Sequence, residues 1–304
     1  MNYLKRYIRG DKFIDTVVVG LLTIFLIVEL YPMLYVVSAS LSDPDAVRAG
    51  ELILLPIDFN LNGYARIFRY KDIWIGYGNT ILYTVLGTII NLAVTLPCAY
   101  AFSRKELVGR TQLMLLFMVT MYISGGLVPS YLNVKSFGLL DSRIWMMLSG
   151  AINVYNMIVA KTYFESSIPY ELTDAAKIDG CSDVGILNKI VLPLSKTITA
   201  VMMIYYGVAH WNSYFDAMIY LEKKEKYPLQ LVLKQILVQG KWAQEAVTGV
   251  DISPEDFAVL QEMAKEADML KYCVIVVSTI PMLIIYPKLQ QFFEKGVMIG
   301  SVKG

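Results

Sequence analysis

The residues with the clearest chemical spacing lie in a short polar stretch between two apolar segments. The stretch reads Asp174-Ala175-Ala176-Lys177-Ile178-Asp179-Gly180 and, nine residues further on, Ile190-Val191-Leu192-Pro193. Gly180 can end a helix in the left-handed conformation, and Ser182 can then cap a second short helix. Ala175 and Ala176 share a helix face on which another backbone can come close. We therefore expect a helix–turn–helix foot, residues 164–195, that contacts a partner protein.

The composition of the whole chain is that of a membrane protein. Its 304 residues are 56% hydrophobic and 17% charged, with a mean hydropathy of +0.51. A soluble domain carries roughly 25% charged residues. The formal net charge is +1, so nothing indicates a nucleic-acid partner.

The side chains that most often carry catalysis or bind metals are sparse. His210 is the one histidine, so histidine-based metal or triad chemistry lacks a second partner. Cys98, Cys181 and Cys273 are far apart and form no CxxC pair, which argues against a disulfide framework or a zinc site. The chain also lacks the G-x-x-x-x-G-K-[ST] loop that cradles phosphates. We predict no catalytic residue, no metal site and no cofactor bound by this chain.

Apolar windows of about 20 residues, the length that crosses a bilayer core, recur along the chain. We predict six spans, at residues 16–38, 79–102, 112–133, 144–163, 196–220 and 270–291. The first ends at Val37-Ser38-Ala39, which looks like a signal cleavage site, but the apolar stretch of this span exceeds the roughly 7–15 residues of a signal peptide. The fold class expected is all-α, with residues 1–304 forming a single transmembrane domain.

Basic residues favour a topology with both termini inside. The number of basic residues in all loops does not distinguish the two orientations. Short segments are more informative, because long loops translocate largely regardless of charge. The crowded short segments hold Lys5, Arg6, Arg9 and Lys12 at the N-terminus and Arg104, Lys105 and Arg110 after the second span. This topology places the foot in the cytoplasm and the loop 222–270 outside.

Irregular and polar residues inside the spans leave alternatives open. The third span is interrupted by Gly125-Gly126 and Pro129; either the break lines a pathway, or the span ends there and a short outer helix follows. Glu29 in the first span would face protein or water, or lie at the outer interface, where it costs little. Span amides can contact a ligand, but hydrogen bonding between helices is their commoner use. These amides are Asn79, Asn91, Asn153 and Asn156.

The fifth span ends in an aromatic and polar run, His210-Trp211-Asn212-Ser213-Tyr214-Phe215-Asp216. Aromatic rings with interleaved hydrogen-bonding groups suit a sugar, whose face is apolar and whose rim is hydroxyl. An interfacial aromatic belt would need no ligand. Trp211 and Tyr214 share a helix face, and Asn212 is turned about 100° from Trp211. We predict a ligand path along Trp211, Asn212 and Tyr214, with the Gly125-Gly126 break nearby.

The foot resembles the cytoplasmic "EAA" loop of binding-protein-dependent ABC import permeases. Every fixed position of that motif matches except the first, where Asp174 replaces a glutamate. Other stretches resemble carbohydrate permeases of the maltose type, and the subgroup for complex oligosaccharides is the most similar. These stretches are Gly138-Leu139-Leu140-Asp141-Ser142, Trp211-Asn212, Tyr286-Pro287-Lys288-Leu289-Gln290 and residues 296–304. The resemblance covers nearly the whole chain.

The resemblance implies a multi-pass permease of the bacterial cytoplasmic membrane with the ABC type I importer fold. It would import oligosaccharide delivered by an external solute-binding protein, beside a second homologous permease, lipid and two ATPase subunits that use ATP and Mg. The residues implied to couple to the ATPase are Glu171, Asp174, Ala175, Ala176, Asp179 and Gly180. The tail residues implied to contact it are Gly300, Ser301, Lys303 and Gly304. The loop 222–270 would reach the binding protein, with partial order over Pro254–Asp268.

Two other classes of protein remain to be weighed. An ion-coupled secondary transporter should show paired ionisable groups inside the membrane or an internal repeat, and Glu29 is the one clear candidate. A structural or sensory membrane protein would leave the foot motif unexplained. The sequence does not name the sugar, and neither its charge nor its aromatic content separates neutral from acidic oligosaccharides.

Overall fold

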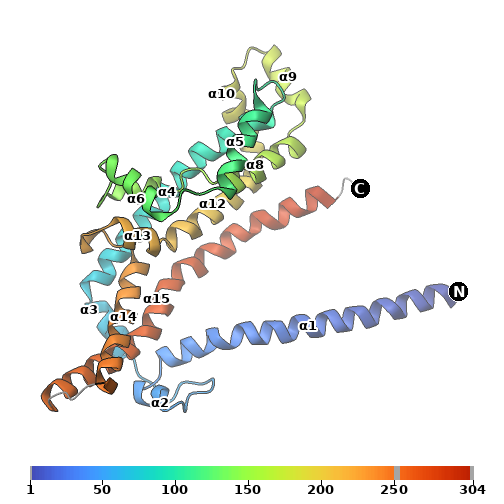
Figure 1. The fold of residues 1–304 in the computed structure, drawn as a ribbon. Coiled ribbons are helices and arrows are strands. Elements are labelled where there is room, and N and C mark those ends of the chain that lie inside the picture. Colours follow the sequence, from blue (N-terminus) through green and yellow to red (C-terminus); the bar gives the residue numbers. More distant parts are fainter. Residues whose placement is uncertain (1, 250–253, 302–304) are drawn as a thin grey trace. The chain divides into compact units, whose positions relative to one another are not determined.

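A computed structural model describes residues 2–249 and 254–301, and the regular elements in these ranges are helices. The chain divides into two compact units. Unit 1 comprises Met1–Tyr70 with Gln235–Thr279, and unit 2 comprises Lys71–Lys234 with Ile280–Gly304. Figure 1 shows the helices of both. The all-helical class predicted from the sequence is confirmed for the described residues.

Unit 1 contains the first helix, the segment that follows it to Tyr70, and residues 235–279. Its elements are α1 (Asn2–Ser40), α2 (Pro44–Arg48), α3 (Asn62–Arg69), most of α14 (Leu229–Gly249) and the first part of α15 (Pro254–Ser301). The apolar side chains along α1 are exposed for most of its length, which suits contact with lipid. The helix continues through Val37-Ser38-Ala39, and Ser38, Ala39 and Ser40 are buried in unit 1.

Charged contacts tie α2 to the first part of α15. Arg48 Nε lies 2.7 Å from Asp268 Oδ2, and Lys265 forms an ion pair with Asp45. The Cys273 thiol donates to the Ser40 carbonyl at 3.2 Å, so α15 is also bonded to the end of α1. The loop 222–270 is helical over α14 and from Pro254 onward, and the partial order expected for Pro254–Asp268 is confirmed.

Unit 2 contains the foot and the central spans. Its complete helices are α4 (Lys71–Ser103), α5 (Arg110–Tyr122), α6 (Leu127–Ser136), α7 (Arg143–Leu148), α8 (Val154–Ser167), α9 (Tyr170–Ile178), α10 (Asp183–Ile186), the π-helix η1 (Leu187–Val191), α11 (Leu192–Leu194), α12 (Lys196–Trp211), α13 (Tyr214–Tyr220) and the 3₁₀-helix η2 (Lys224–Lys226). The first residues of α14 and the part of α15 from Ile280 onward also belong to it. The foot lies at one end of this unit, away from α6 and α13 (Figure 1).

The long helix α4 is the element around which unit 2 is built. It packs against α12, α8, α7 and η2. Glycine allows one close approach: a Cβ at Gly87 would collide with the ring of His210 on α12. Amides then join the elements, because Asn91 Nδ2 donates to the Gly150 carbonyl at 2.7 Å and Asn79 Nδ2 donates to the Glu225 carbonyl at 2.8 Å. The use of these two amides between elements is confirmed.

The continuous apolar helices are fewer than the predicted spans. Within the described residues three helices are long and apolar enough to cross a membrane, namely Lys12–Ser40, Lys71–Ser103 and Phe257–Pro287. Two bent pairs raise this to as many as five. The α5–α6 pair bends by 115° at the Gly125-Gly126 break, and the Asp183–Leu194 segment meets α12 at 86°. The predicted window 144–163 is divided between α7 and α8.

A group of hydrogen bonds around Asp141, called the latch below, joins the loop before α7 to the segment around η2. Asp141, in a left-handed backbone conformation, accepts the backbone N–H groups of Glu222 and Lys223 at 3.2 Å and the ammonium of Lys226 at 2.6 Å. Desolvation raises the pKa of this carboxyl, but the bonds from Lys226, Lys223 and Glu222 outweigh it and hold the pKa below its ordinary value.

We predict that Asp141→Asn lowers stability by about 1.5–3 kcal/mol, the range for hydrogen bonds to a charged group. Because the folded-state pKa is lowered, the stabilisation is complete above the ordinary aspartate pKa of about 4 and is lost as the pH falls through the folded-state value. Thermal unfolding in detergent at pH 7 and at stepwise lower pH measures the difference. Asp58→Asn is the control, because Asp58 is also left-handed but exposed. A difference that persists unchanged at pH 2 would contradict the latch.

Candidate functional site

The turn of the foot is set by local sequence. Helix α9 ends at Ile178 with Asp179 as its C-cap, and Gly180 is left-handed at φ 76°. The Cys181 N–H bonds to the Ala176 carbonyl at 2.9 Å and the Gly180 N–H bonds to the Lys177 carbonyl at 3.0 Å, which together form a Schellman motif. Ser182 Oγ then accepts the Gly185 N–H at 3.2 Å and caps α10. The helix stop and the serine cap expected from the sequence are both confirmed.

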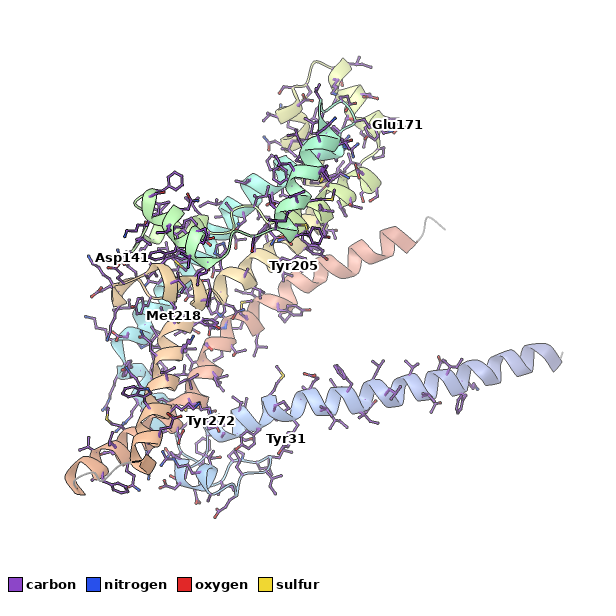
Figure 2. All side chains as sticks on the ribbon, in the orientation of Figure 1. Tyr31, Asp141, Glu171, Tyr205, Met218 and Tyr272 are labelled. Carbon is purple, nitrogen blue, oxygen red and sulfur yellow. The ribbon has the colours of Figure 1, made fainter. Side chains whose placement is uncertain are left out.

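The foot has an exposed face and an inward face. The predicted coupling residues Glu171, Asp174, Ala175, Asp179 and Gly180 are all exposed, and Glu171 lies at the side of the foot (Figure 2). Exposed apolar side chains accompany them, with Ile178 86% and Val184 68% exposed. An apolar and acidic surface of this kind, carried on a polar loop, suits a protein partner better than lipid.

Ala176 does not share that exposed face. It is buried in the core of unit 2 beside Ile186 and Leu187, and Thr173 is buried one turn earlier. The expected pairing of Ala175 and Ala176 on one contact face is therefore corrected. The reason is the return of the chain after Gly180, which packs α10 and η1 against this side of α9. Ala175 remains outside, and Ala176 supports the foot from within.

A π-helical turn connects the foot to α12. The Leu192 N–H reaches back five residues to the Leu187 carbonyl, and Pro193 has no N–H to donate. Such π-turns occur mostly as single turns at functional places in helices. Ile186, Leu187 and Val191 are buried on the inner side of this segment. The Ile190-x-Leu192-Pro193 part of the motif therefore marks the junction at which the foot bends into the span.

A cavity of about 610 Å³ lies elsewhere in unit 2, and its wall is mainly apolar with several polar side chains. Side chains from α4, from the α7–α8 segment and from α12–α13 line it. They include Asn91, Ser149, Asn153, Asn156, Tyr205, Tyr206, His210, Ser213 and Asp216. Figure 2 marks Tyr205 on α12. The described lining residues include one carboxylate and no lysine or arginine, so the wall offers hydroxyls, amides and a histidine.

Hydrogen bonds hold the wall of the cavity in place. Asn91 donates its amide N–H to Gly150, so its Oδ1 faces His210 Nε2 at 2.7 Å as an acceptor. The His210 proton on that bond is therefore on Nε2, and Nδ1 carries a lone pair. On the other side Ser149 Oγ donates to Asp216 Oδ2 at 2.7 Å. These two pairs preorganise a surface that can bind hydroxyl groups.

The predicted path residues lie beside this cavity rather than on it. Trp211 is 4% exposed and packs edge-on against Tyr77, with ring centroids 6.1 Å apart. Asn212 is exposed and bonds to the Val208 carbonyl, and the Tyr214 ring lies under Lys234 Nζ at 4.8 Å. Gly125 and Gly126 are exposed at the α5–α6 bend. None of the five is among the described residues that line the cavity.

The sequence did hold a signal for the lining residues. His210, Ser213 and Asp216 recur every third residue, which places them on one side of a helical path. Asn153, the N-cap of α8, and Asn156 in the first turn of that helix have the same spacing. The aromatic rings led to the prediction of Trp211 and Tyr214, but the lining residues His210, Ser213 and Asp216 lie on another face of the same segment. Periodicity among hydrogen-bonding side chains was the better guide here.

The predicted ATPase-contacting tail belongs to the described residues only as far as Ser301. Gly300 and Ser301 belong to the helical backbone of α15, which runs to Ser301. Lys303 and Gly304 lie outside the described residues. The role assigned to this tail therefore stays a prediction.

Comparison with known proteins places these features in a family. Residues 73–218 match the model of the binding-protein-dependent transport system inner membrane component. The chain is 38% identical over 296 residues to the polygalacturonan/rhamnogalacturonan transport system permease protein YtcP of Bacillus subtilis, covering 97% of this chain and 99% of that protein. It is 36% identical over 277 residues to the protein LplC of the same organism, covering 91% and 90% of the two chains.

A solved structure has the same fold. A chain of a bacterial ABC transporter involved in the import of the acidic polysaccharide alginate is 35% identical, with a TM-score of 0.81 over 94% of this chain and 98% of that chain. This chain therefore belongs to the family of binding-protein-dependent transport system inner membrane components. It is an inner-membrane permease subunit, which confirms the resemblance drawn from the foot and replaces the ion-coupled alternative.

We predict that Gly180→Val uncouples the foot. A β-branched residue at φ 76° is strained by about 1–2 kcal/mol, so the Schellman turn should open and displace the exposed face. Transport should fall several-fold with the protein still inserted in the membrane. Gly180→Asn is the matched control, because asparagine tolerates the left-handed region. Normal transport and normal substrate-stimulated ATPase activity in the valine variant would contradict the coupling role of the foot.

Proposed function

We propose that this chain is one of two permease subunits of an ATP-driven importer that takes up oligosaccharides delivered by an external solute-binding protein. The observation that carries the proposal is the occurrence, within unit 2, of an EAA-type foot and a cavity with several polar side chains, in a chain 38% identical to a polygalacturonan/rhamnogalacturonan transport system permease protein. Two ATPase subunits would use ATP and Mg and would contact Glu171, Asp174, Ala175, Asp179 and Gly180 on the exposed face of the foot.

The proposed topology has six spans with both termini in the cytoplasm. The two bent helix pairs and the divided α7–α8 segment would each count as one crossing. The three long helices Lys12–Ser40, Lys71–Ser103 and Phe257–Pro287 would supply the rest. Basic residues at the N-terminus and after α4 support this orientation. It brings the foot to the cytoplasmic ATPase and the loop 222–270 to the binding protein.

The proposed sugar path follows the cavity of unit 2, whose wall combines apolar area with polar side chains. Sugar hydroxyls need donors and acceptors at fixed positions, and sugar faces need apolar contact. The amide of Asn153, the hydroxyls of Tyr205 and Ser213, and the lone pair on His210 supply the first requirement. Because the described lining has a carboxylate and no cation, this wall suits neutral hydroxyl groups. The acidic groups of a uronate-containing sugar would then face the second permease.

Transport would follow from a change of state at the foot. ATP-driven closure of the ATPase pair would displace the exposed face of α9, and the π-turn would pass that displacement to α12. Since α12 carries Tyr205, Tyr206 and His210, the cavity wall would move with it. This is a two-state element biased from one end by a ligand that the permease itself does not bind.

The experiment that tests the function is reconstitution of the complex. The chain should co-purify with an ATPase and a second permease, and proteoliposomes should take up labelled oligosaccharides only with ATP and the cognate binding protein. A panel of neutral and acidic oligosaccharides identifies the substrate. Uptake driven by an ion gradient without ATP would overturn the proposal.

We predict that a cysteine at Asn153 is labelled by a water-soluble thiol reagent and that a cysteine at Trp211 is not. Both variants are made after Cys98, Cys181 and Cys273 are replaced by alanine, so that the new thiol is the one present. Asn153 is exposed at the cavity, and Trp211 is buried against Tyr77. Oligosaccharide with its binding protein should slow the labelling at 153. Equal labelling at both positions, or no protection by substrate, would remove the path from this cavity.

We also propose that the C-terminal residues Gly300, Ser301, Lys303 and Gly304 contact the ATPase pair. A short glycine-containing tail cannot form a core of its own, so contact with a partner would give it a defined position. Deleting residues 301–304 should lower ATPase activity of the assembled complex without loss of membrane insertion. A truncated complex with unchanged turnover would show that the tail has no such contact.

A further inference from the structure

A buried arginine joins the end of α4 to the first turn of the foot. Arg104 follows α4 directly and is 8% exposed. Its guanidinium carbon lies 4.9 Å from the ring centre of Tyr100 on α4 and 5.0 Å from that of Tyr170 on α9. The cation is therefore held between two aromatic rings from different elements.

Hydroxyl groups supply the polar contacts of this arginine. Nε donates to Ser103 Oγ at 3.0 Å, and Nη1 reaches Thr173 Oγ1 at 3.5 Å. Both hydroxyls donate their own protons to backbone carbonyls at 2.7 Å, so they present lone pairs to the guanidinium. The Tyr170 hydroxyl in turn donates to the Ser103 carbonyl at 3.0 Å. The contacts thus run from the last residues of α4 to the first turn of α9.

Arg104 forms no short ion pair with a carboxylate of the described residues. The nearby charges of Asp183 and Glu106 act on the hydroxyl of the neighbouring Tyr100. The buried Arg104 Nη2 has no hydrogen-bond partner in the part of the chain that the structure describes. Burying a cation without a directly paired counter-ion is costly, and aromatic faces offset part of that cost when the cation is desolvated. An apolar side chain could fill the same space without the penalty. The arginine is therefore explained by geometry, because its planar group can contact two rings and two hydroxyls at once.

A neighbouring arginine has a different set of contacts. Arg110 donates to the Phe102 carbonyl at 2.7 Å and pairs with Glu165 at the end of α8, and Lys161 pairs with the same carboxylate. These bonds hold the ends of α4, α5 and α8 together. Arg104 instead reaches α9, the helix that carries the exposed face of the foot. Arg110 thus holds the ends of α4, α5 and α8 together, and Arg104 connects α4 to the foot.

We propose that Arg104 is the positioning residue that makes α9 move together with α4 when the ATPase displaces the foot. This inference rests on the proposed ATPase contact of the foot. Without the double stacking, α9 can tilt against the end of α4, and ATP hydrolysis then proceeds with less movement of the spans. The ratio of sugar imported to ATP hydrolysed measures this property. A purely structural role would change the amount of assembled complex instead.

The test uses the reconstituted complex with its binding protein. Arg104→Lys keeps the charge but loses the planar stacking, and we expect its ratio of uptake to ATP hydrolysis to fall about tenfold. Tyr170→Leu should behave similarly because it removes one ring. Tyr170→Phe should retain most of the ratio because the ring remains. Lys135→Met is the control, since it removes an exposed cation on α6, away from the foot. Lys105 does not serve for this purpose, because its Nζ lies 5.2 Å from the centre of the Tyr170 ring.

Two further measurements separate the possible failures. A cysteine at Ala175 should still cross-link to the ATPase in Arg104→Lys, which shows that docking survives. In a wild type carrying the Asn153 cysteine, trapping with ATP should change thiol labelling, and Arg104→Lys should weaken that change. An unchanged ratio per assembled complex, or an unchanged labelling response, would overturn the role of Arg104. A wild type that gives no cross-link at Ala175 would instead overturn the proposed function of the foot.

Discussion

The foot and the wall of the cavity share one continuous hydrophobic core. Buried residues run from Ala176 and Ile186 in the foot, through Phe164 and Met157 on α8, to Tyr206 on α12, whose ring also lines the cavity. Close-packed interiors deform little and transmit displacement. Because water and lipid both lie outside this core, a force applied to the foot has a packed route to the cavity. The rest of unit 2 depends on that packing.

Irregular backbone occurs where this core changes direction. The π-turn before Pro193 and the 86° bend at Ser195 redirect the chain from the foot into α12. Such breaks persist in a membrane protein only where neighbouring groups satisfy the freed backbone or water reaches it. Buried side-chain bonds have a similar role deeper in the unit, where Thr95 and the Tyr206 hydroxyl lie 2.7 Å apart. These polar contacts set which faces of α4 and α12 meet.

Local features of the foot were predictable, and its tertiary faces were not. Gly180 and Ser182 act on their own turn, so their roles could be read from spacing. The burial of Ala176 depends on where η1 returns after that turn, and no local pattern contains it. The cavity is a similar case, since Asn91 and His210 are brought together by the fit at Gly87. The division of the 144–163 window into α7 and α8 also escaped hydropathy, which averages over such a break.

The central claim is that the foot and the cavity wall move as one body. Spin labels at Ile178 in the foot and at Asn212 at the end of α12, both exposed, report the distance between these two parts. The distance should be measured by pulsed electron resonance in the nucleotide-free complex and in the complex trapped with ATP. The account predicts the same distance distribution in both states. A distribution that shifts or broadens on trapping would show that the foot moves independently of the span, and would contradict the account.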